Sequence, residues 1–72
     1  MRTKAESPLR NVRRSRTLSQ EDLARLAGVT QESISKAERG KLRLARDVQE
    51  RIAAILGASR HDLFPEKLAV SA

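Results

Sequence analysis

Five polar side chains lie at helical spacing between residues 31 and 39, and their groups both donate and accept hydrogen bonds. They occupy positions i, i+1, i+4, i+5 and i+8 of one helical face: Gln31, Glu32, Ser35, Lys36 and Arg39. The opposite face carries Ile34, Ala37 and Glu38, so only one side of this helix is polar throughout. A polar helix face of this length is suited to the major groove of duplex DNA, where base edges present donors and acceptors.

Few residues of the chain have the chemistry that catalysis or metal binding requires. The sequence has no Cys and a single His, which excludes a disulfide framework, a thiolate zinc site, a cysteine nucleophile and a histidine cluster. It also lacks paired carboxylates in a shared apolar setting, a nucleophile beside a base, and a glycine-rich phosphate loop. We therefore expect no enzymatic activity, no metal, no cofactor and no small-molecule ligand. His61 is expected at the surface of the last helical turn.

Basic residues outnumber acidic residues by 15 to 9, which gives a formal net charge of +6. Residues 1–46 contain twelve basic and five acidic side chains, whereas residues 47–72 contain three and four. The excess lies before the polar helix, from Arg13 to Arg16, and after it, at Lys41, Arg43 and Arg46. This distribution favours a polyanionic partner and places cations where they can lie beside two phosphate strands.

The length and composition predict one small all-α domain. Seventy-two residues are too few for two independent cores. A hydrophobic content of 39% with only 1% aromatic residues suits packed helices with aliphatic side chains between them. Residues 1–6 and 66–72 lack periodicity, so we expect a flexible N-terminal arm and a flexible C-terminal tail around a domain at 7–65. No apolar run approaches the roughly 20 residues that span a bilayer, which predicts a cytoplasmic protein without membrane contact.

Capping residues and glycines divide this domain into five short helices. Ser and Thr residues mark four of the five expected starts, and three glycines and a proline follow four of the expected ends. The predicted helices cover residues 8–16, 20–27, 31–39, 45–57 and 59–64. Because each is too short to be stable alone in water, they must pack on one another. The side chains expected in the core are Leu9, Val12, Leu18, Leu23, Val29, Ile34, Val48, Ile52, Leu56 and Leu63.

The stretch from Gln20 to Arg39 has the composition of two helices that cross steeply at a short turn. Ala24 is small where the helices approach, and Gly28 supplies a residue that tolerates positive φ at the turn. The segments LSQEDLA, GVTQESIS and ERG, followed by ILGAS and DLF, resemble the DNA-binding domain of the Cro/CI-type phage repressors, the XRE family, from Leu9 to Phe64. The resemblance implies a compact five-helix, lambda-repressor-like domain in which the second and third helices form a helix-turn-helix.

The resemblance also implies a role for individual positions. The side chains expected at base edges are Gln31, Glu32, Ser35 and Lys36, and those expected at backbone phosphates are Gln20, Thr30, Arg39, Lys41 and Arg43. Arg13 and Glu38 match a pair that links the first helix to the end of the third, so a structural ion pair is expected there.

Several of these positions have a simpler explanation as well. The carboxylate of Glu32 is also favoured by the dipole of the helix that it begins, without any base contact. The basic stretch from Arg10 to Arg16 can form a solvated face, although we favour phosphate proximity for part of it. An N-terminal arm with Arg2 and Lys4 can be either disordered or placed in a neighbouring DNA groove.

Three apolar residues depart from the commonest family pattern and leave a contact surface open. Leu42 and Leu44 stand where polar residues or a proline are frequent, and Leu26 stands where a charged residue is common. Any of the three can belong to a contact surface. Phe64 suits either the core or half of a dimer seam.

The leading functional hypothesis is a sequence-specific regulator, a repressor or controller, that binds a palindromic operator in double-stranded DNA as a homodimer. Dimerisation is implied by the resemblance alone. The alternative is a protein-interaction module, such as an antitoxin that masks a toxin, with Leu42, Leu44 and residues 65–72 as its docking surface. RNA binding is disfavoured because one aromatic residue offers almost no stacking platform. Membrane binding is disfavoured because Asp47 and Glu50 offset the basic residues of the fourth helix.

Overall fold

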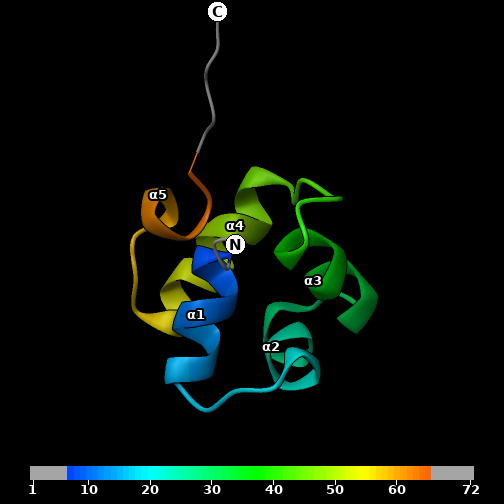
Figure 1. Cartoon of the computed structure of the whole chain (residues 1–72), viewed down its shortest axis with the longest axis horizontal. Coiled ribbons are helices and arrows are strands. Elements are labelled where there is room, and N and C mark those ends of the chain that lie inside the picture. The colour runs from blue at the N-terminus through cyan, green and yellow to red at the C-terminus, as the bar shows by residue number, and fades with distance from the viewer. Residues whose placement is uncertain (1–6, 66–72) are drawn as a thin grey trace, which may run out of the picture.

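The computed structural model describes residues 7–65, and within that range all regular structure is helical. Five helices follow one another in the chain: α1 (Pro8–Ser15), α2 (Gln20–Ala27), α3 (Gln31–Glu38), α4 (Arg46–Leu56) and α5 (Arg60–Leu63) (Figure 1). The expected all-α fold with five helices is confirmed. The arm expected at residues 1–6, with Arg2 and Lys4, and the tail expected at residues 66–72 lie outside the described residues.

Side-chain caps start four of the helices. The hydroxyls of Ser7, Ser19, Thr30 and Ser59 accept hydrogen bonds from backbone N–H groups in the first turns of α1, α2, α3 and α5. Ser19 and Asp22 satisfy each other's backbone N–H groups, which forms a complete capping box on α2. Helix α4 begins after Ala45 without a side-chain cap.

The ends of α1, α2, α3 and α4 share one geometry. The residue after each last turn has a positive φ, and backbone N–H groups bond back to the carbonyls of that turn. Glycine occupies this position after three helices, at Gly28, Gly40 and Gly57. After α1 the position is filled by Thr17, whose φ is 58°. Because the signal for this turn is normally a glycine, the sequence alone does not reveal it.

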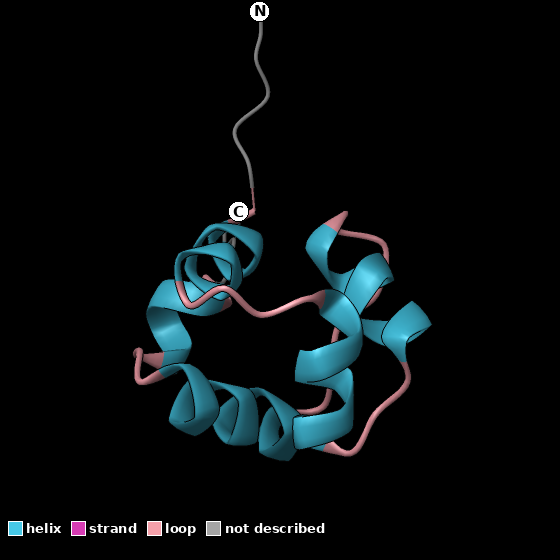
Figure 2. Cartoon of the chain, turned by 90° about the horizontal axis from the view of Figure 1, so that it is seen from below, coloured by secondary structure: helices cyan, strands magenta, loops and turns pink. Residues whose placement is uncertain are grey.

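The helices enclose an aliphatic core. Helix α2 packs against α3 and α4, α1 packs against α5 and α3, and α4 packs against α5. The chain between α1 and α2 crosses from one side of the molecule to the other (Figure 2). Six of the ten expected core residues are fully buried, namely Leu9, Leu23, Ile34, Ile52, Leu56 and Leu63, and the other four are partly buried against them.

The three unusual leucines differ in their exposure. Leu44 is only 8% exposed and belongs to the core, so the suggestion that it forms a contact surface is wrong. It is buried because the loop after α3 turns it inward, where the amide of Gln49 donates a hydrogen bond to its carbonyl at 3.1 Å. Leu26 and Leu42 remain exposed, at 55% and 40%. Phe64 is partly buried against the core.

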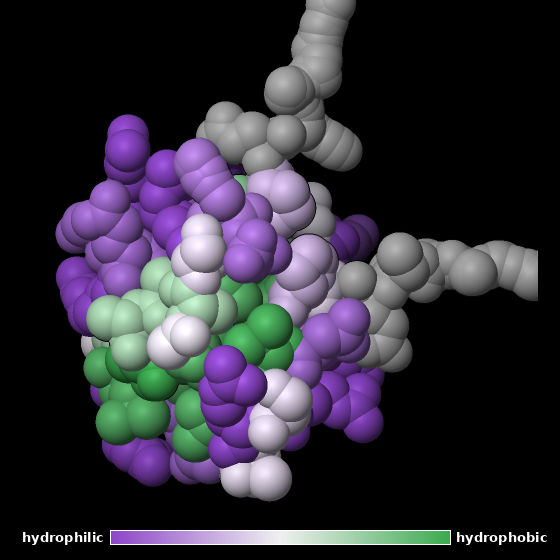
Figure 3. All heavy atoms as spheres, turned by 90° about the vertical axis from the view of Figure 1, so that its left-hand side faces the viewer, coloured by the Kyte–Doolittle hydropathy of each residue, from purple (hydrophilic) through white to green (hydrophobic). Residues whose placement is uncertain are grey.

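The surface is uneven in polarity. Figure 3 shows apolar side chains gathered on the side of the molecule opposite to α3, where α5 and the end of α4 lie. Ile55, near the end of α4, and Ala58, just after the helix, are partly buried hydrophobic residues. Within residues 7–65, no helix has the length and apolar content needed to cross a membrane.

Candidate nucleic-acid interface

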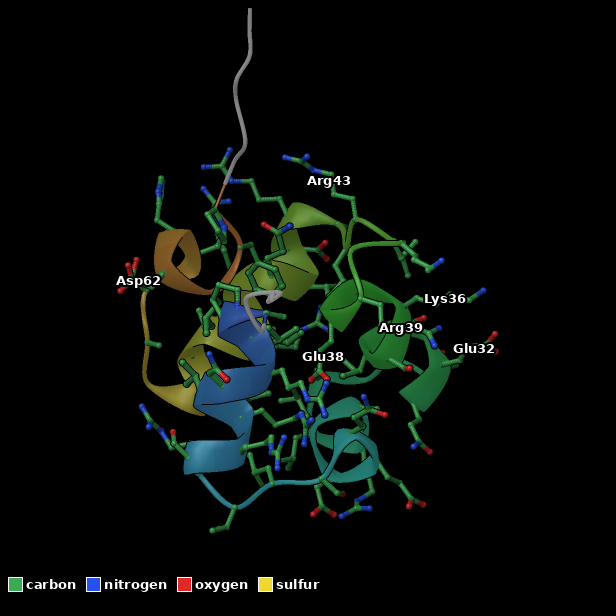
Figure 4. All side chains as sticks on the ribbon, in the orientation of Figure 1. Glu32, Lys36, Glu38, Arg39, Arg43 and Asp62 are labelled. Carbon is green, nitrogen blue, oxygen red and sulfur yellow. The ribbon has the colours of Figure 1, made fainter. Side chains whose placement is uncertain are left out.

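The outer face of α3 is an exposed polar helix surface. Gln31, Glu32 and Lys36 are exposed and Ser35 is partly exposed, whereas Ile34 on the inner face is fully buried. In Figure 4, Glu32 and Lys36 point outward from α3, away from the body of the molecule. The structure therefore brings the four residues expected at base edges together on one accessible face, as the sequence spacing predicted.

Two of these residues pair with each other in the free protein. Glu32 and Lys36, one turn apart on α3, form an ion pair with Oε2 and Nζ 3.3 Å apart. Their side chains are 74% and 46% exposed, so water screens the pair and its contribution to stability is small. Contacts with a ligand can replace this weak ion pair. In the free protein, the carboxylate of Glu32 offsets the charge of Lys36.

Glu38 is the junction between α1, α2 and α3. Its carboxylate accepts hydrogen bonds from Arg13 Nε at 2.6 Å and Arg13 Nη2 at 3.2 Å, and both side chains are nearly buried. The same carboxylate accepts a hydrogen bond from Gln20 Nε2 at 3.0 Å. Figure 4 places Glu38 between the three helices. Arg13 also donates from Nη1 to the carbonyl of Leu18 at 2.7 Å, so each of its three guanidinium nitrogens donates to a group of the protein.

This junction sets the orientation of Gln20, the first residue of α2. One N–H of its side-chain amide is committed to Glu38, and the second N–H of the same group stays available. The backbone N–H groups at the start of α2 lie beside it and carry the positive end of the helix dipole. These groups together are able to hold a phosphate oxygen.

Thr30 has a structural task at the start of α3. Its Oγ1 accepts the backbone N–H of Ser33 at 3.1 Å and donates to the Ser33 hydroxyl at 2.9 Å. A phosphate contact from the Thr30 hydroxyl therefore has to replace the second of these bonds. The first bond fixes where α3 begins and so sets the direction of its outer face.

Three basic residues follow the outer face of α3 along the chain. Arg39, Lys41 and Arg43 are all exposed and lie in the segment between α3 and α4. In Figure 4, Arg43 points outward at the edge of the molecule above α3. Arg46, which follows them, is paired with Glu50 across one turn of α4 at 3.6 Å.

Other arginines of the basic sequence bind the protein itself. Arg16 donates from Nε to the carbonyl of Leu56 at the end of α4 (2.9 Å), and Arg51 donates from Nη1 to the carbonyl of Ala27 at the end of α2 (2.7 Å). Both carbonyls stand in the last turn of a helix, where no partner is available within the helix. Part of the positive charge counted from the sequence is therefore structural. Arg10 and Arg14 stay exposed on α1.

The capping box also changes the acidity of one carboxyl group. The backbone N–H of Ser19 holds the pKa of Asp22 below its ordinary value, with further lowering by the Ser19 hydroxyl and by Arg25. Arg25 Nη2 lies 3.1 Å from Asp22 Oδ1. Each of these partners bonds the ionised form, so the charged carboxylate is favoured at the start of α2.

Comparison with known families agrees with this geometry. Comparison with curated proteins gives no match. The family model described as a helix-turn-helix domain matches residues 8–64, which include all five helices. The match is consistent with the XRE, Cro/CI-type resemblance of the sequence, and α2 and α3 occupy the positions of the two helices that name the motif. The chain belongs to the helix-turn-helix domain family, whose members bind DNA.

Proposed function

We propose that this chain is a sequence-specific transcription regulator that binds double-stranded DNA with α3 in the major groove. The observation that carries the proposal is the outer face of α3, which is polar and accessible and belongs to a helix held in place by contacts on its inner side. Ile34 anchors the helix in the core and Glu38 ties its end to α1 and α2, so the outer side chains are held on a rigid element.

The proposed base contacts come from Gln31, Glu32, Ser35 and Lys36. Glutamine suits bidentate pairing with adenine, lysine suits guanine, glutamate accepts from cytosine N4, and serine bonds to either a donor or an acceptor. Each good pair contributes about 1–3 kcal/mol of discrimination between bases. The exposure of this face and the absence of any covering element among residues 7–65 support the assignment.

The proposed phosphate contacts come from Gln20, Thr30, Arg39, Lys41 and Arg43, which flank the base-contacting face. Gln20 and Thr30 stand at the starts of α2 and α3, where backbone N–H groups favour anions. The three cations lie just beyond the end of α3. Contacts of this kind position the protein on the duplex without carrying sequence information.

We further propose that two copies bind a palindromic operator and that occupancy alone represses, or otherwise controls, a promoter. One recognition helix contacts only a few base pairs, so a symmetric pair of helices doubles the specific interface. The proposed ligand is DNA alone, with no enzymatic step, cofactor or small-molecule effector, and the proposed site of action is the cytoplasm.

The alternative is an interaction module such as an antitoxin that masks a toxin. The exposed Leu42 supports it, whereas the burial of Leu44 removes half of the leucine pair on which that surface was based. Weak DNA binding that is insensitive to salt, together with tight capture of a partner protein, would favour this alternative.

Selection of bound sites from random-sequence DNA tests the proposed function, combined with light scattering of the resulting complexes. We expect one enriched palindromic motif, two chains per site, and an affinity that falls steeply with salt, by a logarithmic slope of about 0.9 for each phosphate neutralised. Recovery of random sequences with one chain per duplex would contradict both specificity and dimer binding.

A further inference from the structure

Gln49 is a buried polar residue whose side chain links α4 to two other parts of the fold. It lies one turn into α4 and is only 6% exposed. Its amide Nε2 donates to the carbonyl of Leu44 at 3.1 Å, and its Oε1 accepts a hydrogen bond from Arg60 Nη1 of α5, also at 3.1 Å. A donor faces an acceptor in both bonds, which fixes the orientation of the amide. The side chain therefore joins α5 to the segment that precedes α4.

This side chain supplies a tie at the start of α4, which begins without a side-chain cap. Two N–H groups of Gln49 bond carbonyls that precede the helix. The backbone N–H donates to the carbonyl of Ala45 at 2.9 Å, and the side-chain amide donates to that of Leu44. The first bond belongs to the ordinary helical ladder, so the second is an additional constraint that the glutamine side chain provides.

Leu44 passes this constraint on to Arg43. The side chain of Leu44 is in the core at 8% exposure and its carbonyl is bound by Gln49, so side chain and backbone are both anchored. The preceding residue, Arg43, is exposed, and in Figure 4 its side chain points outward above α3. Residues 42–45 form no regular secondary structure. The anchor at Leu44 therefore constrains the backbone from which Arg43 projects.

The other two proposed phosphate contacts after α3 are tied to α3 itself. The backbone N–H groups of Arg39 and Lys41 both donate to the carbonyl of Lys36, in the last turn of that helix. Their backbone consequently follows α3, whereas the backbone of Arg43 adjoins the residue that Gln49 anchors.

We propose that Gln49 is a positioning residue for DNA binding, which holds Arg43 at the phosphate backbone, and that Arg60 keeps the Gln49 amide in the required orientation. Loss of the amide leaves the outer face of α3 in place but loosens the segment that carries Arg43. The result is a loss of affinity that is the same on every DNA sequence. This role rests on the proposed phosphate contact of Arg43, whereas the anchoring of the segment does not.

The test uses Gln49→Met, which keeps the approximate length and volume of the side chain, changes no charge and removes both hydrogen bonds. A second variant, Gln49→Asn, keeps a polar amide in the same site but is one methylene shorter, so it cannot make both bonds. Ile52→Val is the matched control, because it alters a fully buried side chain of the same helix but removes no hydrogen-bonding group.

Backbone order parameters from NMR, measured without DNA, test the anchoring. In the wild-type chain and in Ile52→Val, residues 42–44 should have the value of about 0.85 that is typical of rigid backbone. In both Gln49 variants the values should fall toward about 0.6, while those of α3 stay unchanged. Values at residues 42–44 that are the same in the wild type and in the Gln49 variants overturn the proposal, as does an equal fall in Ile52→Val.

Salt titrations on selected and random duplexes test the role toward DNA, with affinities expressed per folded molecule. Arg43→Ala should weaken binding about tenfold, the order of a hydrogen bond to a charged group, and Gln49→Met should weaken it about threefold or more on both duplexes. In the double variant of Gln49→Met with Arg43→Ala, affinity should stay within about twofold of that of Arg43→Ala alone, because both changes act through one contact. Combined with Gln31→Ala, the losses should instead multiply.

Three results of these titrations overturn the proposal: losses that multiply in the double variant with Arg43→Ala, a loss confined to the selected duplex, or an equal loss in Ile52→Val. A wild-type chain that binds neither duplex overturns the DNA role together with the proposed function. The order parameters are measured without DNA, so they decide separately whether Gln49 anchors the segment.

Discussion

The amide of Gln20 is held 3.0 Å from the same carboxylate, that of Glu38, which pairs with Arg13 in the interior. The side chain that begins α2 is thus oriented by the residue that ends α3. A buried ion pair of this kind contributes at least as much to the relative placement of helices as to stability. Here the pair ties α1 to the end of α3, and the hydrogen bond from Gln20 adds the start of α2, so a proposed phosphate contact is connected to the helix that carries the base-contacting face.

Replacing Arg13 with alanine should therefore affect folding more than DNA binding. The change leaves the Glu38 carboxylate buried without its cation, which costs about 3–5 kcal/mol in comparable pairs. We expect the free energy of unfolding, measured with urea, to fall by that order, while the affinity per folded molecule changes only a few-fold. Arg10→Ala, on the exposed face of α1, is the control and should change stability by about 0.5 kcal/mol or less. The opposite ranking would identify Arg13 as a phosphate contact.

Gln31→Ala and Arg43→Ala should differ in the kind of binding that they weaken. A base contact contributes to discrimination, so Gln31→Ala should lower affinity for the selected sequence by about 1–3 kcal/mol and leave random DNA almost unchanged. A phosphate contact acts on every sequence alike, so Arg43→Ala should weaken both and reduce the salt slope by about one. Titrations of selected and random duplexes at several salt concentrations separate the two. Equal losses on both duplexes for Gln31→Ala would remove it from the base-contacting set.

Glu32→Ala should change affinity in opposite directions on the two kinds of DNA. The change removes a negative charge from the DNA-facing side and releases Lys36 from its ion pair, so binding to random DNA should strengthen. If Glu32 accepts a hydrogen bond from cytosine, binding to the selected sequence should weaken by about 1–3 kcal/mol. Stronger binding to both duplexes would assign Glu32 to the helix dipole alone.

The helices and their outer and inner faces were predictable because the signals are local. Ser19, Thr30 and Gly28 mark helix ends through bonds to residues only a few positions away, and the spacing of Ile34 fixes the inner face of α3. Contacts between distant residues left no local signal, and the Arg13–Glu38 pair was expected from the family resemblance alone. The bond from Arg51 to the end of α2 joins residues far apart in the chain, and nothing in the sequence distinguishes this arginine from an exposed one.

The same limit explains the error at Leu44 and the hidden turn at Thr17. Leu44 follows no periodic helix, so its burial depends on how the loop after α3 closes over the core. Thr17 adopts a left-handed backbone conformation that glycine usually takes. A β-branched residue at this position therefore does not predict the turn. The spacing of residues in α3 predicted that its polar side chains share one face. The hydrogen bond between Gln20 and Glu38 became visible only in the folded structure.

Asp22→Asn should destabilise the domain at neutral pH and have less effect in acid. The folded state lowers the pKa of Asp22 below its ordinary value of 3.8, so its charge stabilises the fold above that pH and the contribution is lost as the pH falls through the lowered pKa. The gap in melting temperature between wild type and variant should therefore be largest near neutrality and narrow as the pH falls below 3.8. Glu21→Gln, in the same turn but outside the capping box, should show a smaller gap. A gap that stays constant with pH would contradict the role of the charge.

Thr17→Gly should stabilise the domain, because Thr17 is the one residue other than glycine that has a positive φ among residues 7–65. A β-branched residue at its φ of 58° is strained, and the left-handed conformation costs an L-residue about 1–2 kcal/mol. Glycine removes this strain but loses more backbone entropy on folding, so we expect a net gain of about 0.5–1 kcal/mol in urea unfolding.

Gly57→Ala gives the reverse comparison at the end of α4. A Cβ added to Gly57 meets no atom within 4 Å, so its effect reports the backbone conformation alone, at a φ of 67°. It should cost about 1 kcal/mol, because alanine has to adopt the left-handed conformation that glycine takes freely. Neither Thr17 nor Gly57 is among the proposed DNA contacts, so neither variant should change DNA affinity. If Thr17→Gly lowered stability while Gly57→Ala behaved as expected, the Thr17 hydroxyl, which donates to the carbonyl of Arg16, would have to contribute more than the strain costs.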